Sequence, residues 1–318
     1  MRLPWGFEYL KHFIKINQGN YLVTKVAIIT RTKNRPILLP RVRASVENQT
    51  FRDFVWVLVN DAGERGEVDR QADIARTNGV DVVVVHRDKS VGMEAASNDG
   101  MKKSSSEYAV IHDDDDTWQP DFLKQTVDYL DENISNVGVV THSIRIDEEI
   151  TDNHVKITGK SSFNGQLNSI KLSDLSFHNN FPPISFLFRR SCYDAVNGFD
   201  ETLPVLGDWD FNLRTLLEGD IGLIPEALAN YHFRISNVKA SDSYGNTVTA
   251  GIDKHIQYEA IYRNRKLRND INTNSLGLGF VLHQAYVAGP RHQSYVSLLI
   301  QKILKKIGLF EFVKRLLS

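Results

Sequence analysis

Short apolar segments alternate with segments of helical pattern in the first third of this chain, and this alternation constrains its fold more than any other feature. Each apolar run is long enough for a buried strand, and polar residues follow at its end. Because strands that alternate with helices form βαβ units, the pattern predicts an α/β fold with a mostly parallel sheet flanked by helices. The predicted strands are 26–30, 54–59, 82–85 and 108–111, and the predicted helices are 37–49, 67–78 and 93–103.

The rest of the chain has a less regular pattern. Between 159 and 180 it is polar and rich in turn-forming residues, which predicts a long surface excursion. Further elements are expected on both sides of a turn at 197–200. They are a strand that leads into a helix at 185–190, a helix at 209–218, and two short strands at 221–224 and 227–233.

The composition argues against several classes of protein. No stretch approaches 18 consecutive apolar residues, so no transmembrane helix is predicted, and the first residues lack the features of a signal peptide. The net charge of -1 argues against broad nucleic-acid binding. Cys192 is the only cysteine, which fits a reducing compartment and is more typical of packing than of a nucleophile. We therefore expect a cytoplasmic protein.

Polar side chains follow each of the four predicted strands. They include Asn60 and Asp61 after the second strand and His86 and Arg87 after the third. The carboxyl ends of parallel strands form the edge at which such sheets bind ligands. A ligand site is therefore expected where these polar clusters meet.

The run Asp113–Asp116, which follows the fourth strand, is the most acidic of these clusters. Consecutive carboxylates at the end of a buried strand repel one another unless a positive charge neutralises them. A divalent cation bound through oxygen ligands, together with a phosphate substrate, would supply that charge. The alternative is an acidic turn that caps the next helix.

An ordered set of motifs over residues 25–235 resembles the family 2 inverting glycosyltransferases, which have the GT-A fold. The resemblance implies a nucleotide-sugar donor, a divalent metal ion, and inversion at the anomeric carbon. No single motif is decisive, but their order and spacing are specific. The matching segments are 26–36, 45–50, 59–63, Asp113–Asp116 with Trp118, Pro120 and Asp121, 197–200, 207–210, and Tyr231 with His232.

The resemblance places the diphosphate and the metal ion at the acidic cluster. Asp113 and Asp115 align with the Asp-x-Asp motif of the family, so Asp115 is expected to bind Mn²⁺ or Mg²⁺ and Asp113 the ribose or the sugar. The register is open by one residue, so Asp114 is also a donor-binding candidate. His232 resembles a further metal ligand, and an imidazole would favour Mn²⁺. The alternative for His232 is a structural histidine.

The nucleoside is expected at the first two strand ends. The resemblance assigns donor contacts to Thr30, Arg31 and Asn34. Asp61 is expected to accept a hydrogen bond from the base, which would suit the N3–H of uracil and a UDP-sugar; the alternative is an Asx turn. Arg31 and Arg35 could also pair with phosphate.

Asn98 is a further donor-binding candidate. It lies in a segment where many family members have Arg-Asn, whereas this chain has Ser97-Asn98. The contact of the missing arginine is either absent or supplied by Arg87 or Lys89.

Asp208 is the expected general base of the reaction. It precedes a predicted helix, so a backbone hydrogen bond could orient it. Gly207 stands where the family often has Glu, which is a departure from its Glu-Asp pattern. A plain helix cap is the alternative. Trp209 and Asp210 are the acceptor-binding candidates, and for Trp209 a core position is equally compatible with the sequence.

The last segment, 294–318, combines apolar residues at helical spacing with five basic residues and only one acidic residue, Glu311. This pattern is typical of a basic amphipathic helix that binds an anionic membrane surface. The alternative is a helix that packs on the main domain or on a second copy in a homodimer. We expect three parts: an N-terminal extension (1–24), a GT-A glycosyltransferase domain (25–250) and a helical C-terminal region (251–318).

Together these features predict a cytoplasmic or peripheral membrane glycosyltransferase of the hexosyl or N-acetylhexosaminyl type. The acceptor would be a saccharide or a lipid-linked glycan, as in polysaccharide biosynthesis. One alternative is a nucleotidyltransferase, although Arg31–Pro36 lacks the glycines of a phosphate-binding loop. The other is a non-catalytic glycan-binding or scaffold protein with the same fold.

Overall fold

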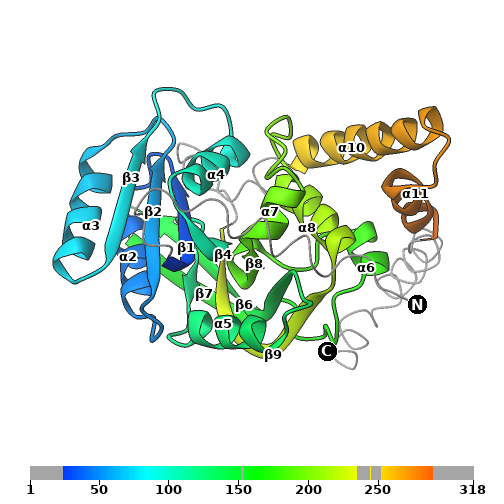
Figure 1. Ribbon diagram of the computed structural model, residues 1–318. Coiled ribbons are helices and arrows are strands. Elements are labelled where there is room, and N and C mark those ends of the chain that lie inside the picture. The colour runs from blue at the N-terminus through cyan, green and yellow to red at the C-terminus, as the bar shows by residue number, and fades with distance from the viewer. Residues whose placement is uncertain (1–23, 152–153, 235–243, 245–251, 289–318) are drawn as a thin grey trace, which may run out of the picture.

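A single mixed sheet with helices on both faces makes up the structure, a computed structural model that describes residues 24–151, 154–234, 244 and 252–288 (Figure 1). Its strand order is β3-β2-β1-β4-β8-β6-β9-β5, with β7 paired to β6. The predicted α/β class, with a mostly parallel sheet flanked by helices, is confirmed. The helices of the region after 251 form the predicted helical extension.

The first half of the sheet is parallel and has the predicted order of elements. Residues of β1 lie between partners on β2 and β4, with Ile28 aligned to both Trp56 and Val110. Strands β1, β2 and β3 are each followed by a helix, as in βαβ units. The elements are β1 (Thr24–Thr32), α2 (Leu39–Glu47), β2 (Phe54–Asn60), α3 (Gly66–Thr77), β3 (Asp81–His86), α4 (Met93–Lys102) and β4 (Ser106–Ile111).

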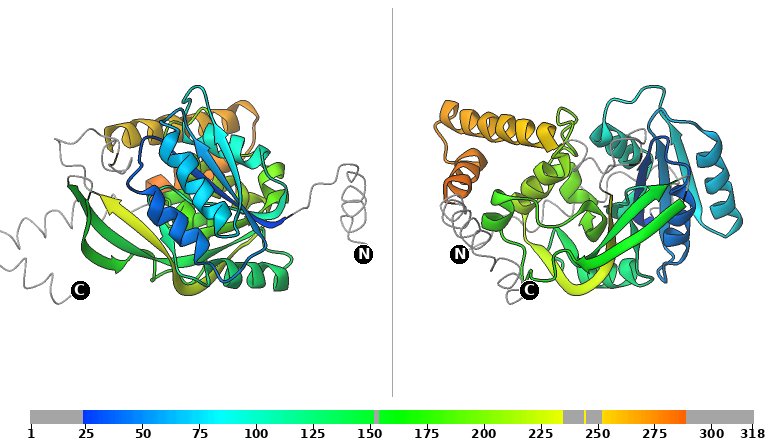
Figure 2. Two further views of the ribbon diagram at one scale, coloured as in Figure 1. Left: turned by 90° about the vertical axis from the view of Figure 1, so that its left-hand side faces the viewer. Right: turned by 180° about the vertical axis from the view of Figure 1, so that it is seen from behind.

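The second half of the sheet is mixed in direction. Strand β8 is antiparallel to both β4 and β6, while β6 and β9 are parallel. Figure 2 shows β6 and β7 in green beside the end of β9 in yellow at one margin of the molecule. The elements are β5 (Thr117–Trp118), α5 (Phe122–Glu132), β6 (Gly138–Thr151), β7 (His154–Ser162), α6 (Leu172–Phe177), η1 (Pro183–Ser185), β8 (Phe186–Arg189), α7 (Arg190–Ala195), α8 (Gly207–Glu218) and β9 (Ile221–Arg234).

Two sequence predictions for this half were wrong. The segment 159–180 is not one surface excursion, because β7 continues to Ser162 and α6 forms within it. The two short strands predicted at 221–224 and 227–233 are one strand, β9, which pairs with β6 through an irregularity near His142. The irregularity interrupts the alternation of apolar and polar residues, which explains why the sequence suggested a break.

Alternate residues of the buried strands contribute to two separate cores. Val26 and Ile28 belong to the core under α2, α3 and α5, whereas Ala27 and Ile29 belong to the core under α4, α6 and α8. This two-sided burial is why the first strands are continuous apolar runs rather than alternating ones.

The second core extends to the last two described helices, α10 (Ile252–Asn272) and α11 (Leu278–Ala288), drawn in orange in Figure 1. Tyr262 of α10 is fully buried, and the Arg263 guanidinium donates hydrogen bonds to the carbonyls of Ser176, Phe177 and Leu282. These contacts fix α10 and α11 against α6. None of the helices in the described ranges is both long and apolar enough to cross a membrane.

Candidate active site

A cavity of about 1250 Å³ opens where the carboxyl ends of β1, β2 and β4 meet the start of α8. Most of the predicted site residues line it, because the ends of parallel strands converge on one edge of the sheet. The sequence-predicted residues in its wall are Arg31, Asn34, Asp61, Asp113, Asp114, Asp115, Asp208 and Trp209.

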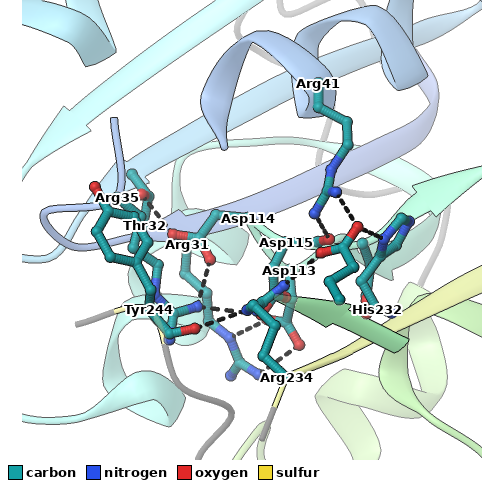
Figure 3. A network of polar contacts seen from close by, with 12 residues as sticks. Arg31, Thr32, Arg35, Arg41, Asp113, Asp114, Asp115, His232, Arg234 and Tyr244 are labelled. Atoms are coloured by element: carbon teal, nitrogen blue, oxygen red, sulfur yellow. Dashed lines mark hydrogen bonds and ion pairs between the residues drawn. The ribbon is translucent and has the colours of Figure 1, made fainter. Parts of the chain in front are cut away.

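Arginines surround the acidic cluster (Figure 3). The Asp114 carboxylate accepts hydrogen bonds from Thr32 Oγ1 at 2.6 Å and from Arg35 Nη1 at 2.9 Å. The Asp115 carboxylate accepts from Arg35 at 3.2 Å and pairs with Arg234. Burial acts to raise the pKa of Asp115, but the charges of Arg234 and Arg35 outweigh it and lower the pKa. Asp115 is therefore an anion at neutral pH.

Asp113 is held by Arg31. The Nε atom of Arg31 donates to Asp113 Oδ1 at 2.8 Å, and its Nη1 donates to Ser97 Oγ at 2.9 Å. The guanidinium that lies against Ser97 is thus that of Arg31. Arg87 instead pairs with Asp61 and Asp99.

Glu148 of β6 carries a second ionic network that the sequence did not reveal. Its carboxylate accepts from Arg41 at 2.5 Å, from Arg234 at 3.1 Å and from His232 Nδ1 at 2.6 Å. Burial acts to raise the pKa of Glu148, but its bonds to His232 and Arg41 lower it to about 2. Because Arg234 bonds both Asp115 and Glu148, it joins this network to the acidic cluster.

The two networks differ in how well they suit a divalent cation. Carboxylates such as Asp113 and Asp115 at the cavity wall are hard oxygen ligands. His232 fits less well, because Nδ1 bonds Glu148 and Nε2 lies 2.9 Å from Thr117 Oγ1. In the described residues, no group of three or more His, Cys, Asp or Glu side chains is arranged to hold a metal ion. These contacts argue against His232 as a ligand and favour the structural alternative.

Asp61 lines the cavity just after the end of β2. Its carboxylate accepts hydrogen bonds from Arg87 Nη1 at 2.5 Å and from Ser90 Oγ at 2.6 Å. Asn34 adopts a left-handed conformation with φ of 54°, and its Oδ1 accepts from the backbone N–H of Glu64 at 2.9 Å. Asn34 therefore joins the loops that follow β1 and β2, and Asp61 faces the cavity between them.

Two predicted donor-binding residues have structural roles instead. Thr30 is fully buried, and its Oγ1 accepts a hydrogen bond from the indole N–H of Trp56 at 2.9 Å. Asn98 holds the turn at 197–200, because its amide donates to the Phe199 carbonyl and accepts from the Phe199 N–H. Neither residue is part of the cavity wall. These two assignments are therefore corrected.

Asp208 stands at the start of α8 and faces the same cavity. Its Oδ2 accepts from Asn179 Nδ2 at 2.8 Å, and Asn212 in turn donates to Asn179 Oδ1 at 3.1 Å. Burial raises the pKa of Asp208, while the backbone N–H of Trp209 and the charge of Arg31 act in the opposite direction. A half-buried carboxylate with raised proton affinity suits a proton acceptor.

The two predicted acceptor residues are held within the protein. Trp209 is 2% exposed, and its indole N–H donates to the Leu175 carbonyl at 2.6 Å, which favours the core alternative. Asp210 is fully buried and outside the cavity wall; Tyr262 and Arg214 bond it at 2.9 and 2.7 Å. Asp210 is therefore corrected to a packing role.

Several residues that the sequence did not single out contribute charge or hydrogen bonds to the site. Arg234 carried a usable signal, because it is a charged residue at the end of a predicted strand, two positions after His232. Glu94 lies in a predicted helix, but nothing in the pattern of that helix marked it as a site residue. The others gave no signal in the sequence. These residues include Arg41, Glu94, Glu148, Asn179 and Arg234.

Sheet order, helix placement and the acidic cluster at the sheet edge together define a GT-A type glycosyltransferase fold. The sequence model of Glycosyl transferase family 2 matches residues 27–194, just over half of the chain. The chain therefore belongs to this family, and it is a glycosyltransferase enzyme.

Sequence relatives carry the same assignment. The glycosyltransferase YwdF of Bacillus subtilis is 27% identical over 211 residues, which are 66% of this chain and 74% of YwdF. The PGL/p-HBAD biosynthesis glycosyltransferase Rv2957 of Mycobacterium tuberculosis is 26% identical over 189 residues, 59% of this chain and 68% of that protein.

Solved structures of similar fold include two with bound donors. TarS of S. aureus, residues 1–349 with UDP-GlcNAc, has a TM-score of 0.55 at 17% identity, over 68% of this chain and 61% of that 1–349 chain. The mannosyltransferase PcManGT of Pyrobaculum calidifontis, in complex with GDP-Man and Mn²⁺, has a TM-score of 0.55 at 16% identity, over 83% of this chain and 70% of PcManGT. At these identities the likeness concerns the fold.

Proposed function

We propose that this protein transfers a sugar from a nucleoside diphosphate donor to an acceptor hydroxyl with inversion at the anomeric carbon. The observation that carries the proposal is the placement of two carboxylate groups on one cavity: the arginine-bound cluster Asp113–Asp115 and the separate carboxylate of Asp208. A diphosphate needs charge neutralisation, and an attacking hydroxyl needs a proton acceptor. The cavity offers a candidate group for each.

The donor would lie along the strand ends. Arg31 and Arg35 belong to the cavity wall, and arginine guanidinium groups match the geometry of phosphate oxygens. Asp61 would accept a hydrogen bond from the base, which supports a UDP-sugar. TarS binds UDP-GlcNAc and PcManGT binds GDP-Man, so both nucleotides belong in a donor screen.

Asp115 would hold a Mn²⁺ or Mg²⁺ ion beside the diphosphate, and Asp113 would face the ribose or the sugar. The presence of Mn²⁺ in PcManGT supports the choice of metal. A bound divalent ion stabilises the charge that develops on the departing diphosphate. Asp115 already has Arg35 and Arg234 as partners, so ion binding requires these guanidinium groups to shift. The shift would leave Arg35 and Arg234 beside the phosphates, where they can neutralise further charge.

Asp208 would act as the general base. The acceptor oxygen forms a bond to the anomeric carbon as the bond from that carbon to the diphosphate oxygen breaks, and the hydroxyl proton passes to Asp208. Attack on the face opposite the leaving group inverts the configuration. Asn179 orients the carboxylate through its hydrogen bond to Oδ2.

The acceptor is proposed to be a saccharide or a lipid-linked glycan of polysaccharide biosynthesis. The basic segment 294–318 would hold the enzyme on the cytoplasmic face of a membrane, or would pack on a second copy in a homodimer. This segment, like the extension 1–23, lies outside the described residues. Family membership favours transfer over the nucleotidyltransferase and scaffold alternatives.

A donor screen tests the proposal directly. The full-length protein is mixed with UDP- and GDP-sugars, with Mn²⁺ or with EDTA, and both thermal stability and donor hydrolysis are measured. Since a ligand that binds the folded state raises its melting temperature, a true donor should stabilise the protein and be hydrolysed slowly. If no nucleotide sugar stabilises the protein or is turned over, the proposed function is wrong.

A further inference from the structure

Glu94 of α4 is a buried carboxylate that the transfer chemistry alone does not require. It is 3% exposed and belongs to the wall of the cavity. Its Oε2 lies 3.4 Å from Arg31 Nη1, its one ion-pair partner among the described residues. A carboxylate is seldom buried with so few ionic partners, so the burial of Glu94 points to a functional role.

Gly207 makes the position of Glu94 possible. A Cβ atom at residue 207 would lie 2.3 Å from the carboxyl carbon of Glu94 and 2.4 Å from its Oε1. Such distances are far shorter than van der Waals contact, so any side chain at 207 would displace the carboxyl group. Glu94 thus occupies the space beside the backbone of the residue that precedes Asp208.

Arg31 connects Glu94 to the donor side of the cavity. The same guanidinium bonds Asp113 through Nε at 2.8 Å and Ser97 through Nη1 at 2.9 Å. Glu94 and Asp113 therefore hold Arg31 from two directions. Loss of the Glu94 charge would leave the guanidinium with one carboxylate partner and more freedom to move.

We propose that Glu94 is a positioning residue of the transfer reaction: it holds Arg31 against Asp113 and places a second carboxylate beside Asp208. This inference rests on the proposed function, because it assigns Glu94 a role toward the base and the donor site. Ionised Glu94 increases the proton affinity of Asp208 and so makes it a stronger base.

The electrostatic surroundings of Glu94 support this role. Burial raises its pKa to about 7, with the charges of Asp208 and Asp113 acting in the same direction and Arg31 acting against them. The charged groups that face it are thus Arg31 of β1, Asp113 after β4 and Asp208 of α8. Above pH about 7 the Glu94 carboxyl is ionised, so the rate should rise as pH increases through this value.

Glu94→Gln tests the proposal, because it keeps the shape of the side chain and removes the charge. We expect kcat to fall about 10-fold, the effect of about one pKa unit on a proton-transfer equilibrium, and the rise of rate near neutral pH to disappear. The KM for the donor should change much less. Glu107→Gln is the control, since Glu107 lies outside the cavity wall and pairs with Lys25 at 2.7 Å near the start of β4. It should keep the wild-type rate and pH profile.

A double-mutant cycle with Gly207→Ala provides a second, independent test. The added methyl group should displace the Glu94 carboxyl and lower kcat in the wild-type background, but cause little further loss in Glu94→Ala. Equal losses in both backgrounds would overturn the proposal, even if Glu94→Gln fails to fold. A folded Glu94→Gln with the wild-type rate and pH profile would also overturn it. If Asp208→Asn is inactive in that case, the proposed function itself still stands.

Discussion

Two carboxylate regions share one cavity and differ in how their charge is balanced. Around Asp113–Asp115 and Glu148, the described residues place four guanidinium groups, those of Arg31, Arg35, Arg41 and Arg234. Among the described residues, the side-chain hydrogen bond to Asp208 comes from the neutral amide of Asn179, while the charge of Arg31 acts on Asp208 without a hydrogen bond between them. In the first region the charges of Arg234 and Arg35 lower the pKa of Asp115, although burial raises the pKa of Asp114. In the second region burial raises the pKa of Asp208.

The difference suits two separate tasks, binding of the diphosphate in the first region and proton transfer in the second. A site that binds an anionic diphosphate benefits from carboxylates already paired with cations, because the cations can rearrange around phosphate oxygens and a metal ion. A general base gains from fewer bonded cations, since a cation bonded to it would lower its proton affinity. Substitutions in the two regions should therefore affect donor binding and turnover separately.

The largest expected effect is that of Asp208→Asn. The amide keeps the hydrogen-bonding geometry but cannot take the acceptor proton, so kcat should fall by about 10² or more. Donor affinity should stay near that of the wild type, because the donor-side carboxylates are intact. Steady-state kinetics and calorimetric donor titration measure the two quantities. A parallel loss of donor affinity would show that the two regions are not separate.

Asp115→Ala should instead act mainly on donor affinity. Loss of this carboxylate removes an expected metal ligand, so donor affinity in Mn²⁺ should fall by at least about 10-fold, the scale of damaged metal sites. The protein should remain folded. Donor titration in Mn²⁺ and in EDTA, for both wild type and variant, makes the comparison. Equal wild-type affinity in the two buffers would refute a metal-dependent donor site.

Asp210→Asn tests whether Asp210 has a structural role, in contrast to the catalytic role proposed for Asp208. Asp210 is fully buried and bonds Tyr262, Arg214 and Lys266. Its substitution should lower the free energy of unfolding by about 1–3 kcal/mol, as expected when buried charged partners lose their hydrogen bonds. Turnover of the folded protein should change little.

Chemical denaturation checks this loss of stability. Asp128→Asn is its control, because Asp128 forms an exposed pair with Lys124 whose loss should cost less than about 1 kcal/mol. A stable Asp210→Asn with greatly reduced turnover would return Asp210 to the acceptor site.

Asn179→Ala should have the smallest effect, a shift in the pH profile. The Asn179 amide favours the ionised form of Asp208, so its removal should raise the pKa of Asp208 further. The acidic limb of the kcat profile then moves to higher pH, with a modest loss of rate at neutral pH. Asn212→Ala, which removes only the support of Asn179, should shift it less in the same direction. A limb that moves to lower pH would contradict this assignment.

The sequence predicted the parallel half of the fold well and the rest less well, for a physical reason. Strands such as β1 and β2 are buried on both faces, so they appear as continuous apolar runs. Strand β7 is almost wholly exposed, and β6 mixes apolar and charged residues, so neither gave a clear signal.

The same limit applies to the site. Asp113–Asp115 and Asp208 could be selected from local motifs, and the structure brings them to one cavity. The pairing of Asp115 with Arg234 joins residues 119 positions apart, and that of His232 with Glu148 depends on the alignment of β6 with β9. Such pairings follow from topology, which local patterns do not contain.

The stereochemistry of donor cleavage tests the central claim most directly. Slow hydrolysis of an α-linked nucleotide sugar, followed by NMR before the free sugar equilibrates, reports which anomer is released first and requires no knowledge of the acceptor. A single displacement in which Asp208 activates the attacking oxygen predicts the β anomer, and Asp208→Asn should abolish its release. First release of the α anomer would contradict the account, because it would mean that the configuration is retained.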